Sequence, residues 1–74
     1  MTRYEKLHKL SNAIKEYRGK KNEATGKWID QPKPSARKRV ERWLAELGMN
    51  PASEIQRIDG FKTYAEFFTW IKSR

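Results

Sequence analysis

Residues 35–51 read SARKRVERWLAELGMNP, and this stretch contains the clearest helical pattern in the chain. Its apolar residues recur at i, i+4, i+7, i+8 and i+11, which is typical of an amphipathic helix. They are Ala36, Val40, Trp43, Leu44 and Leu47. Ser35 follows Pro34 and is a suitable N-cap, and Gly48 is a residue type that commonly ends helices. We therefore predict a helix over residues 35–47.

A longer helix is predicted on the N-terminal side. Thr2 and Glu5 form a capping box, in which each side chain accepts a hydrogen bond from a backbone N–H of the first turn. Apolar residues then recur at helical spacings, and they are Tyr4, Leu7, Leu10, Ile14 and Tyr17. Gly19 supplies a C-cap. These signals predict a helix over residues 3–18.

Two shorter helices are predicted on the C-terminal side. Asn50 as N-cap and Pro51 at the first helical position begin one over residues 51–58. A second capping box at residues 63–66 begins another over residues 64–73. Its expected core-facing residues are Tyr64, Phe67, Phe68 and Ile71. With no strand-type alternation and no repeat, the whole chain is predicted to be a single all-α domain of three to four helices.

The connection between the first two helices, residues 19–34, predicts a long basic loop. Two glycines and two prolines interrupt it and no periodicity persists. Loops of this length are often functional or mobile. Trp28 and Ile29 are apolar residues within this polar stretch, so we expect them to anchor the loop onto the core.

Positive charge is concentrated in the first half of the chain. The 74 residues contain 17 Lys and Arg against nine Asp and Glu, a formal net charge of +8. Residues 1–39 hold twelve of these bases and four of the acids, whereas residues 40–74 hold five of each. Net charge informs about partners rather than fold. Three classes of partner suit this positively charged region: a nucleic acid, an acidic protein surface and an anionic membrane surface.

Three consecutive cations, Arg37, Lys38 and Arg39, occupy the first turn of the predicted 35–47 helix. The helix dipole is positive there, so each cation costs roughly a few tenths of a kcal/mol. A helix N-terminus surrounded by cations suits a phosphate or a carboxylate. The competing interpretation is a charge run that serves solubility and is screened by salt. We predict that the partner-binding surface comprises Lys20, Lys21, Lys27, Arg37, Lys38, Arg39 and Arg42.

Two tryptophans, Trp28 and Trp70, are candidate interface residues. Trp28 lies in the predicted loop, and Trp70 falls about 100° away from the apolar stripe of its helix. Exposed tryptophan commonly anchors protein interfaces and also stacks on bases. Packing at the edge of the core is the competing interpretation for both.

The helices predicted over residues 35–47 and 51–58 are similar in outline to a helix-turn-helix. The second helix would then present Ser53, Gln56 and Arg57 to base edges. A glycine turn between two helices is also common in helical bundles of other function.

The residue types needed for catalysis are sparse. Cysteine is missing, and the only histidine, His8, is expected on a solvent-facing side of the first helix. The aspartates lie in turns, and several glutamates serve as caps or as i,i+4 partners, such as Glu41 for Arg37 and Glu46 for Arg42. No phosphate-binding or dinucleotide-binding fingerprint is present. We therefore expect no enzymatic activity, no metal, no cofactor and no small-molecule substrate.

The chain also lacks the signals of a membrane or secreted protein. No apolar run approaches the roughly 18 residues that a membrane span needs. Residues 1–5 do not resemble the start of a signal peptide. We expect a soluble cytoplasmic protein without a membrane partner.

Residues 17–58 resemble part of the phage terminase small-subunit family. Tyr17, a lysine-rich linker, Gly26 and Pro34 precede a basic helix, which is followed by the segment Leu47-Gly48-Met49-Asn50-Pro51-Ala52-Ser53. The resemblance implies a phage origin and, in that family, recognition of viral DNA during packaging together with ring assembly. The aromatic residues 61–71 have no counterpart in the family pattern.

Size and charge are also similar to those of small phage early proteins that bind host RNA polymerase. We expect a non-catalytic regulator, in the host cytoplasm if phage-encoded, that binds DNA or the acidic surface of a host transcription complex. A DNA-packaging or structural assembly subunit is the alternative. Salt-sensitive binding to naked duplex, a complex that survives nuclease and discrete oligomers would respectively distinguish the three.

Overall fold

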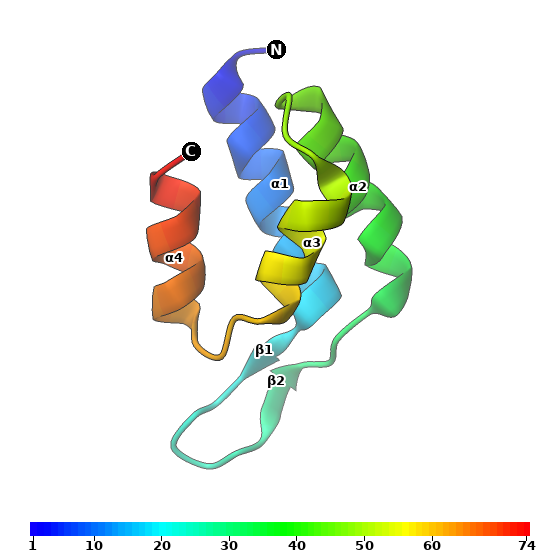
Figure 1. The fold of residues 1–74 in the computed structure, drawn as a ribbon. Helices are drawn as coiled ribbons and strands as arrows, with labels where there is room; N and C mark the ends of the chain where they lie inside the picture. The colour runs from blue at the N-terminus through cyan, green and yellow to red at the C-terminus, as the bar shows by residue number, and fades with distance from the viewer.

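The computed structural model describes the backbone of residues 1–74 and every side chain except that of Tyr64. This described chain forms four helices, namely α1 (Arg3–Arg18), α2 (Arg37–Glu46), α3 (Pro51–Asp59) and α4 (Tyr64–Lys72), as shown in Figure 1. A 3₁₀ turn, η1 (Pro34–Ala36), precedes α2, and two short strands, β1 (Lys20–Lys21) and β2 (Trp28–Asp30), form an antiparallel pair. The prediction of a mostly helical fold with four helices is confirmed, with each boundary within two residues.

Side-chain caps begin three of the helices as predicted. Thr2 accepts a hydrogen bond from the N–H of Glu5, and Thr63 accepts one from Glu66 in the same way. Asn50 accepts from two N–H groups in the first turn of α3.

The predicted Ser35 cap of α2 is wrong. Ser35 lies inside η1, and Ala36, which makes no side-chain capping bond, is the N-cap residue. The 3₁₀ turn leads directly into the helix, so the backbone is already helical where an extended N-cap residue would stand.

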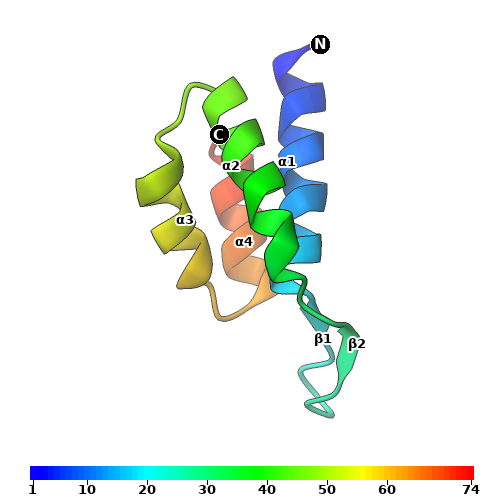
Figure 2. The ribbon, with the colours of Figure 1, turned by 90° about the vertical axis from the view of Figure 1, so that its right-hand side faces the viewer.

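The core lies where the four helices meet, and Figures 1 and 2 show them arranged as a bundle. The apolar stripe of α2 is confirmed, because Val40 and Leu44 are fully buried and Trp43 packs against the core. Full burial of one such aliphatic side chain contributes roughly 1.5–3 kcal/mol. The other large core residues are Leu47 directly after α2, Leu10 and Ile14 of α1, Ile55 and Ile58 of α3, and Phe67 and Trp70 of α4.

The predicted apolar face of α1 is wrong at Tyr4, whose side chain is 78% exposed. The 16 residues of α1 span about 24 Å at 1.5 Å per residue, whereas the other three helices have nine or ten residues. The first turn of α1 therefore extends beyond the core that these shorter helices form. The corresponding prediction for Tyr64 concerns a side chain outside the described residues.

The orientation of α4 differs from the prediction. Phe67 is buried as predicted, but Phe68, which was also expected in the core, is 44% exposed, and Trp70 is only 6% exposed. Trp70 and Phe67 both contact the ring of Phe61, at centroid distances of 5.9 and 6.4 Å. Tryptophan has the largest apolar surface to bury, so its packing decides which face of α4 turns inward. Trp70 is thus a core residue, and its prediction as an interface aromatic is wrong.

The long basic loop is not confirmed, because β1 and β2 pair within it and form an antiparallel ribbon that projects from one end of the bundle (Figures 1 and 2). The turn between the strands is organised by Asn22. Its N–H donates to the carbonyl of Lys27 at 2.8 Å, and its side-chain oxygen accepts from the N–H of Ala24 at 2.9 Å. Such bonds join backbone groups without requiring alternation of apolar residues, so the periodicity of the sequence does not reveal them.

Because Gly19 has no side chain, the chain that returns from the ribbon can pack closely against the end of α1. The φ of 72° and ψ of −179° of Gly19 lie in a region that is essentially restricted to glycine. A Cβ at this position would stand 2.7 Å from both the carbonyl oxygen of Asp30 and the nitrogen of Pro32. The N–H of Lys33 donates to the carbonyl of Glu16 at 2.9 Å and holds the returning chain against α1.

The last turn of α1 is also joined to the end of α3. The Arg18 guanidinium donates to three backbone oxygens, those of Ile58 at 3.1 Å, Asp59 at 2.6 Å and Phe61 at 2.6 Å. The Tyr17 hydroxyl donates to the carboxylate of Asp59 at 2.8 Å. These bonds connect residues about 40 positions apart and hold the base of the ribbon in place relative to α3.

The Tyr17 hydroxyl makes the stability of the fold sensitive to pH in the alkaline range. Burial raises its pKa above the ordinary 10.0, and the hydrogen bond to Asp59 and the charge of Asp59 raise it further, against the lowering effect of Arg37 and Arg18. Protonated Tyr17 therefore stabilises the fold below pH 10.0, and this contribution is lost as the pH rises through the raised pKa. We expect the difference in Tm between the native protein and Tyr17→Phe to shrink above that pH. Parallel Tm profiles of the two proteins, followed by circular dichroism, would contradict this.

Candidate binding surface at the ribbon end

The end of the bundle that carries the ribbon also carries most of the net charge. Residues 15–39 hold nine Lys and Arg against three Asp and Glu, which is +6 of the total +8. In Figures 1 and 2 the C-terminal end of α1, the ribbon and the N-terminal end of α2 lie together, with the N-terminus of the chain at the opposite end. We call this region, residues 15–39, the ribbon end.

The structure brings the two predicted groups of cations to this same end. All are exposed, and those within the ribbon end are Lys20, Lys21, Lys27, Arg37, Lys38 and Arg39. Arg42, the last member of the predicted set, lies farther along α2 with its guanidinium 5.3 Å from the ring centroid of Trp43. It therefore stacks on an aromatic ring rather than forming the predicted pair with Glu46, which contacts Lys6.

Two of the α2 cations form ion pairs within the molecule. Arg37 Nε lies 3.0 Å from Glu41 Oε1, as predicted, and Arg39 pairs with Glu16 across to α1. All four side chains are substantially exposed, and pairs of this kind contribute about 0–1 kcal/mol. They can therefore exchange for an anionic partner at low cost. Among the described side chains, neither Lys27 nor Lys38 forms an ion pair.

The large apolar side chains of the ribbon are more exposed than predicted. Trp28 and Ile29 are 44% and 58% exposed, so the expectation that they anchor the connection to the core is wrong. The physical reason is that the ribbon projects past the core. Lys21 Nζ lies 5.4 Å from the centroid of the Trp28 ring. Phe68 of α4 has a similar neighbour, Lys15, whose Nζ lies 5.9 Å from its ring centroid.

A groove of about 960 Å³ lies between the ribbon, the last part of α1 and the start of α4. Lys15, Lys20, Lys33, Asp30 and Phe68 are among the residues that line it. Lys20 belongs to the predicted binding set, whereas Lys15 and Lys33 do not, and Phe68 was assigned to the core.

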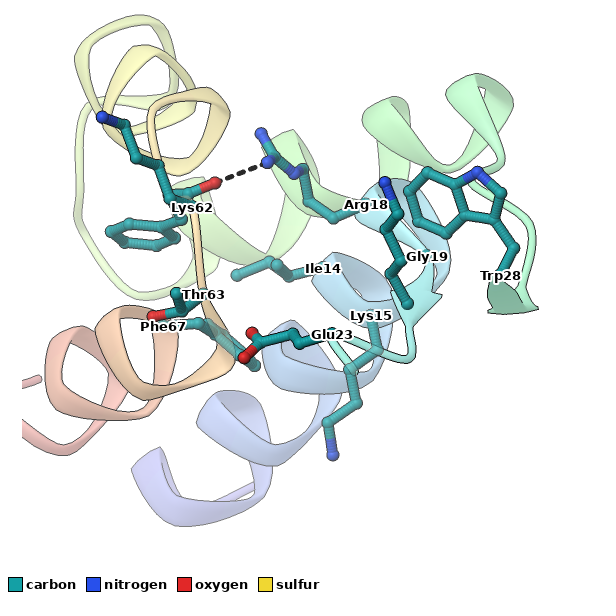
Figure 3. A pocket seen from close by; sticks show the side chains of 11 residues that line it. Ile14, Lys15, Arg18, Gly19, Glu23, Trp28, Lys62, Thr63 and Phe67 are labelled. Atoms are coloured by element: carbon teal, nitrogen blue, oxygen red, sulfur yellow. Dashed lines mark hydrogen bonds between the residues drawn. The ribbon is translucent and has the colours of Figure 1, made fainter. Parts of the chain in front are cut away.

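A smaller cleft of about 160 Å³ adjoins this groove, and both are lined by Lys15, Lys21, Glu23 and Thr63. Figure 3 shows Trp28 on its ribbon side, Lys62 and Phe67 on the other, and Arg18 reaching to a backbone oxygen between them. This bond is one of those that link α1 to the end of α3. Arg18, although it lines the cleft, therefore serves to hold the fold together.

The residues of the alternative helix-turn-helix interpretation lie on α3. Ser53, Gln56 and Arg57 are all exposed, and the neighbouring Glu54 lies 3.8 Å from Arg74. Their exposure is compatible with that interpretation, which stays a prediction.

Among the side chains that the structure describes, no group of three His, Cys, Asp or Glu is placed to hold a metal ion. None of the described helices combines the length and the apolar character needed to cross a bilayer.

No protein-family model matches this sequence, and comparisons with curated proteins and with solved structures find no match either. The resemblance of residues 17–58 to phage terminase small subunits, and the phage origin that it implies, therefore stay predictions.

Proposed function

We propose that this protein is a non-catalytic regulator of nucleic-acid machinery and that it acts by binding DNA through its ribbon end. The observation that carries the proposal is the gathering of six exposed cations from two separate segments at one end of the bundle. If the chain is phage-encoded, the machinery is a host transcription complex such as RNA polymerase.

The shape of the ribbon end supports contact with phosphates. Lys20, Lys21 and Lys27 lie on a ribbon that projects from the bundle, so they can reach a backbone without a large part of the bundle being buried. The α2 cations lie at the same end and enlarge the surface. A protein that neutralises phosphates in this way releases counterions, so its affinity must fall steeply with salt.

We expect Lys21→Gln/Lys27→Gln to weaken duplex binding and to lower the slope of log affinity against log salt by about 2, one unit for each lost phosphate contact. A matched control is Lys9→Gln/Lys72→Gln, which removes the same charge from exposed positions outside the ribbon end. This control should leave the slope nearly unchanged. Fluorescence anisotropy with a labelled duplex over a salt series measures both.

Equal weakening by the two double variants would show that the ribbon end is not the site. If the protein binds no DNA at low salt but retains a bacterial protein after nuclease treatment, the DNA proposal fails and an acidic protein surface takes its place. In that outcome the ribbon-end variant should lose the protein partner while the control keeps it.

A further inference from the structure

We infer that the ribbon end, together with Phe68 of α4 in the adjoining groove, binds single-stranded nucleic acid, with unpaired bases stacked on Trp28 and Phe68. This inference rests on the proposed nucleic-acid binding and names the form of nucleic acid that the site selects. It starts from two aromatic rings on separate elements, each of which is 44% exposed and has a lysine ammonium group over it.

Each ring is placed where a base could reach it. Trp28 lines the smaller cleft from the ribbon, and Phe68 lines the adjoining groove from α4. The groove of about 960 Å³ is at the upper end of the range of roughly 300–1,000 Å³ found for sites that hold small organic ligands. The two hollows share four lining residues, so one strand can follow both.

The charges around these rings match a strand in which phosphates and bases alternate. The ammonium groups of Lys15 and Lys21 lie over the rings of Phe68 and Trp28, on flexible side chains that can move aside to neutralise phosphates flanking a stacked base. Glu23 and Asp30 also line the groove and would repel a phosphate, but a carboxylate accepts hydrogen bonds from the N–H groups that unpaired bases expose, the ring N–H of thymine included. A surface that bound phosphates alone would gain nothing from these acids.

Stacking on exposed rings distinguishes a single strand from a duplex. In a duplex the faces of the bases are covered by their neighbours, and only base edges are accessible in the grooves. A positively charged groove with aromatic rings is the arrangement by which proteins bind single strands without a strong sequence preference. The ribbon end and Phe68 of α4 together supply both features, within two adjoining hollows.

The test compares binding of a labelled oligothymidine of roughly 15 nucleotides, a length suited to such sites, with binding of a duplex of equal length. We expect Trp28→Ala and Phe68→Leu each to weaken single-strand binding about tenfold, the typical effect of losing one stacking ring. Duplex affinity should change less than about twofold, because phosphate contacts remain. Trp28→Phe keeps a ring and should retain most of the single-strand affinity.

Tyr4→Ala is the matched control, since Tyr4 is an exposed aromatic residue at the N-terminal end of α1, away from the ribbon. It should bind the oligothymidine like the native protein. Phe68→Leu keeps apolar contact with Phe67, whose ring lies 5.6 Å away, so the fold is retained. Far-UV circular dichroism verifies this for every variant.

The inference is overturned if Trp28→Ala and Phe68→Leu bind oligothymidine as tightly as the native protein, or if the duplex is bound more tightly than the single strand. In either case duplex binding that still depends on Lys21 and Lys27 would leave the proposed function intact. If neither nucleic acid is bound at low salt, both the inference and the proposed function fail.

Discussion

Replacing Gly19 by alanine should lower the free energy of unfolding by about 2–4 kcal/mol, because backbone strain and a steric clash act together. The φ of 72° with ψ near 180° is unfavourable for any residue with a Cβ. The new methyl group would also lie 2.7 Å from backbone atoms of Asp30 and Pro32, which cannot rotate away as a side chain can. The returning chain must move, so the base of the ribbon should separate from α1.

Gly48→Ala is the matched control. Gly48 also has a positive φ, of 76°, but a Cβ there would meet no atom within 4 Å. Only the cost of the left-handed conformation applies, which is about 1–2 kcal/mol. Urea denaturation followed by circular dichroism gives both values. If Gly19→Ala is no more destabilising than Gly48→Ala, the close approach of the ribbon to α1 is incorrect.

Replacing Arg18 by methionine should cost about 2–4 kcal/mol, because hydrogen bonds from a charged donor are lost and partly buried carbonyls are left unpaired. The guanidinium donates to the backbone oxygens of Ile58, Asp59 and Phe61, which lie at the end of α3 and in the segment after it. Methionine retains apolar contact but supplies no donor. Arg18→Lys restores the charge without the fork of donors and should recover less than half of the loss.

Arg3→Met is the control for this prediction. Arg3 also donates two hydrogen bonds, at 3.1 and 2.9 Å, but to the exposed carbonyl of Arg74 at the chain end. Water can replace that donor, so we expect a cost below about 1 kcal/mol. Equal effects of Arg18→Met and Arg3→Met on urea denaturation would mean that Arg18 does not join α1 to α3.

The helices were predictable because their signals are local. Thr2, Asn50 and Thr63 accept hydrogen bonds from N–H groups two or three residues away, so a short segment contains all that the cap needs. The stripe of α2 was equally clear, since its burial follows from helical spacing alone. The concentration of cations in residues 1–39 is likewise a property of the sequence.

The ribbon and the orientation of α4 required the tertiary structure. Pairing of β1 with β2 depends on backbone hydrogen bonds between segments of two and three residues, Lys20–Lys21 and Trp28–Asp30, which are too short to show an alternation of apolar and polar residues. On α4, Phe68 and Trp70 compete for the core, and contacts with Phe61 from outside the helix decide in favour of Trp70.

The candidate site has the same two origins. The sequence by itself determined which residues carry the positive charge and that Arg37 can pair with Glu41 one turn later. Tertiary structure alone decided that the ribbon and α2 cations share one end of the bundle, that Arg39 pairs with Glu16, and that Phe68 lines a groove. The reason is that charge and local spacing are set by the order of the amino acids. Exposure of an aromatic ring depends instead on which other side chains occupy the core.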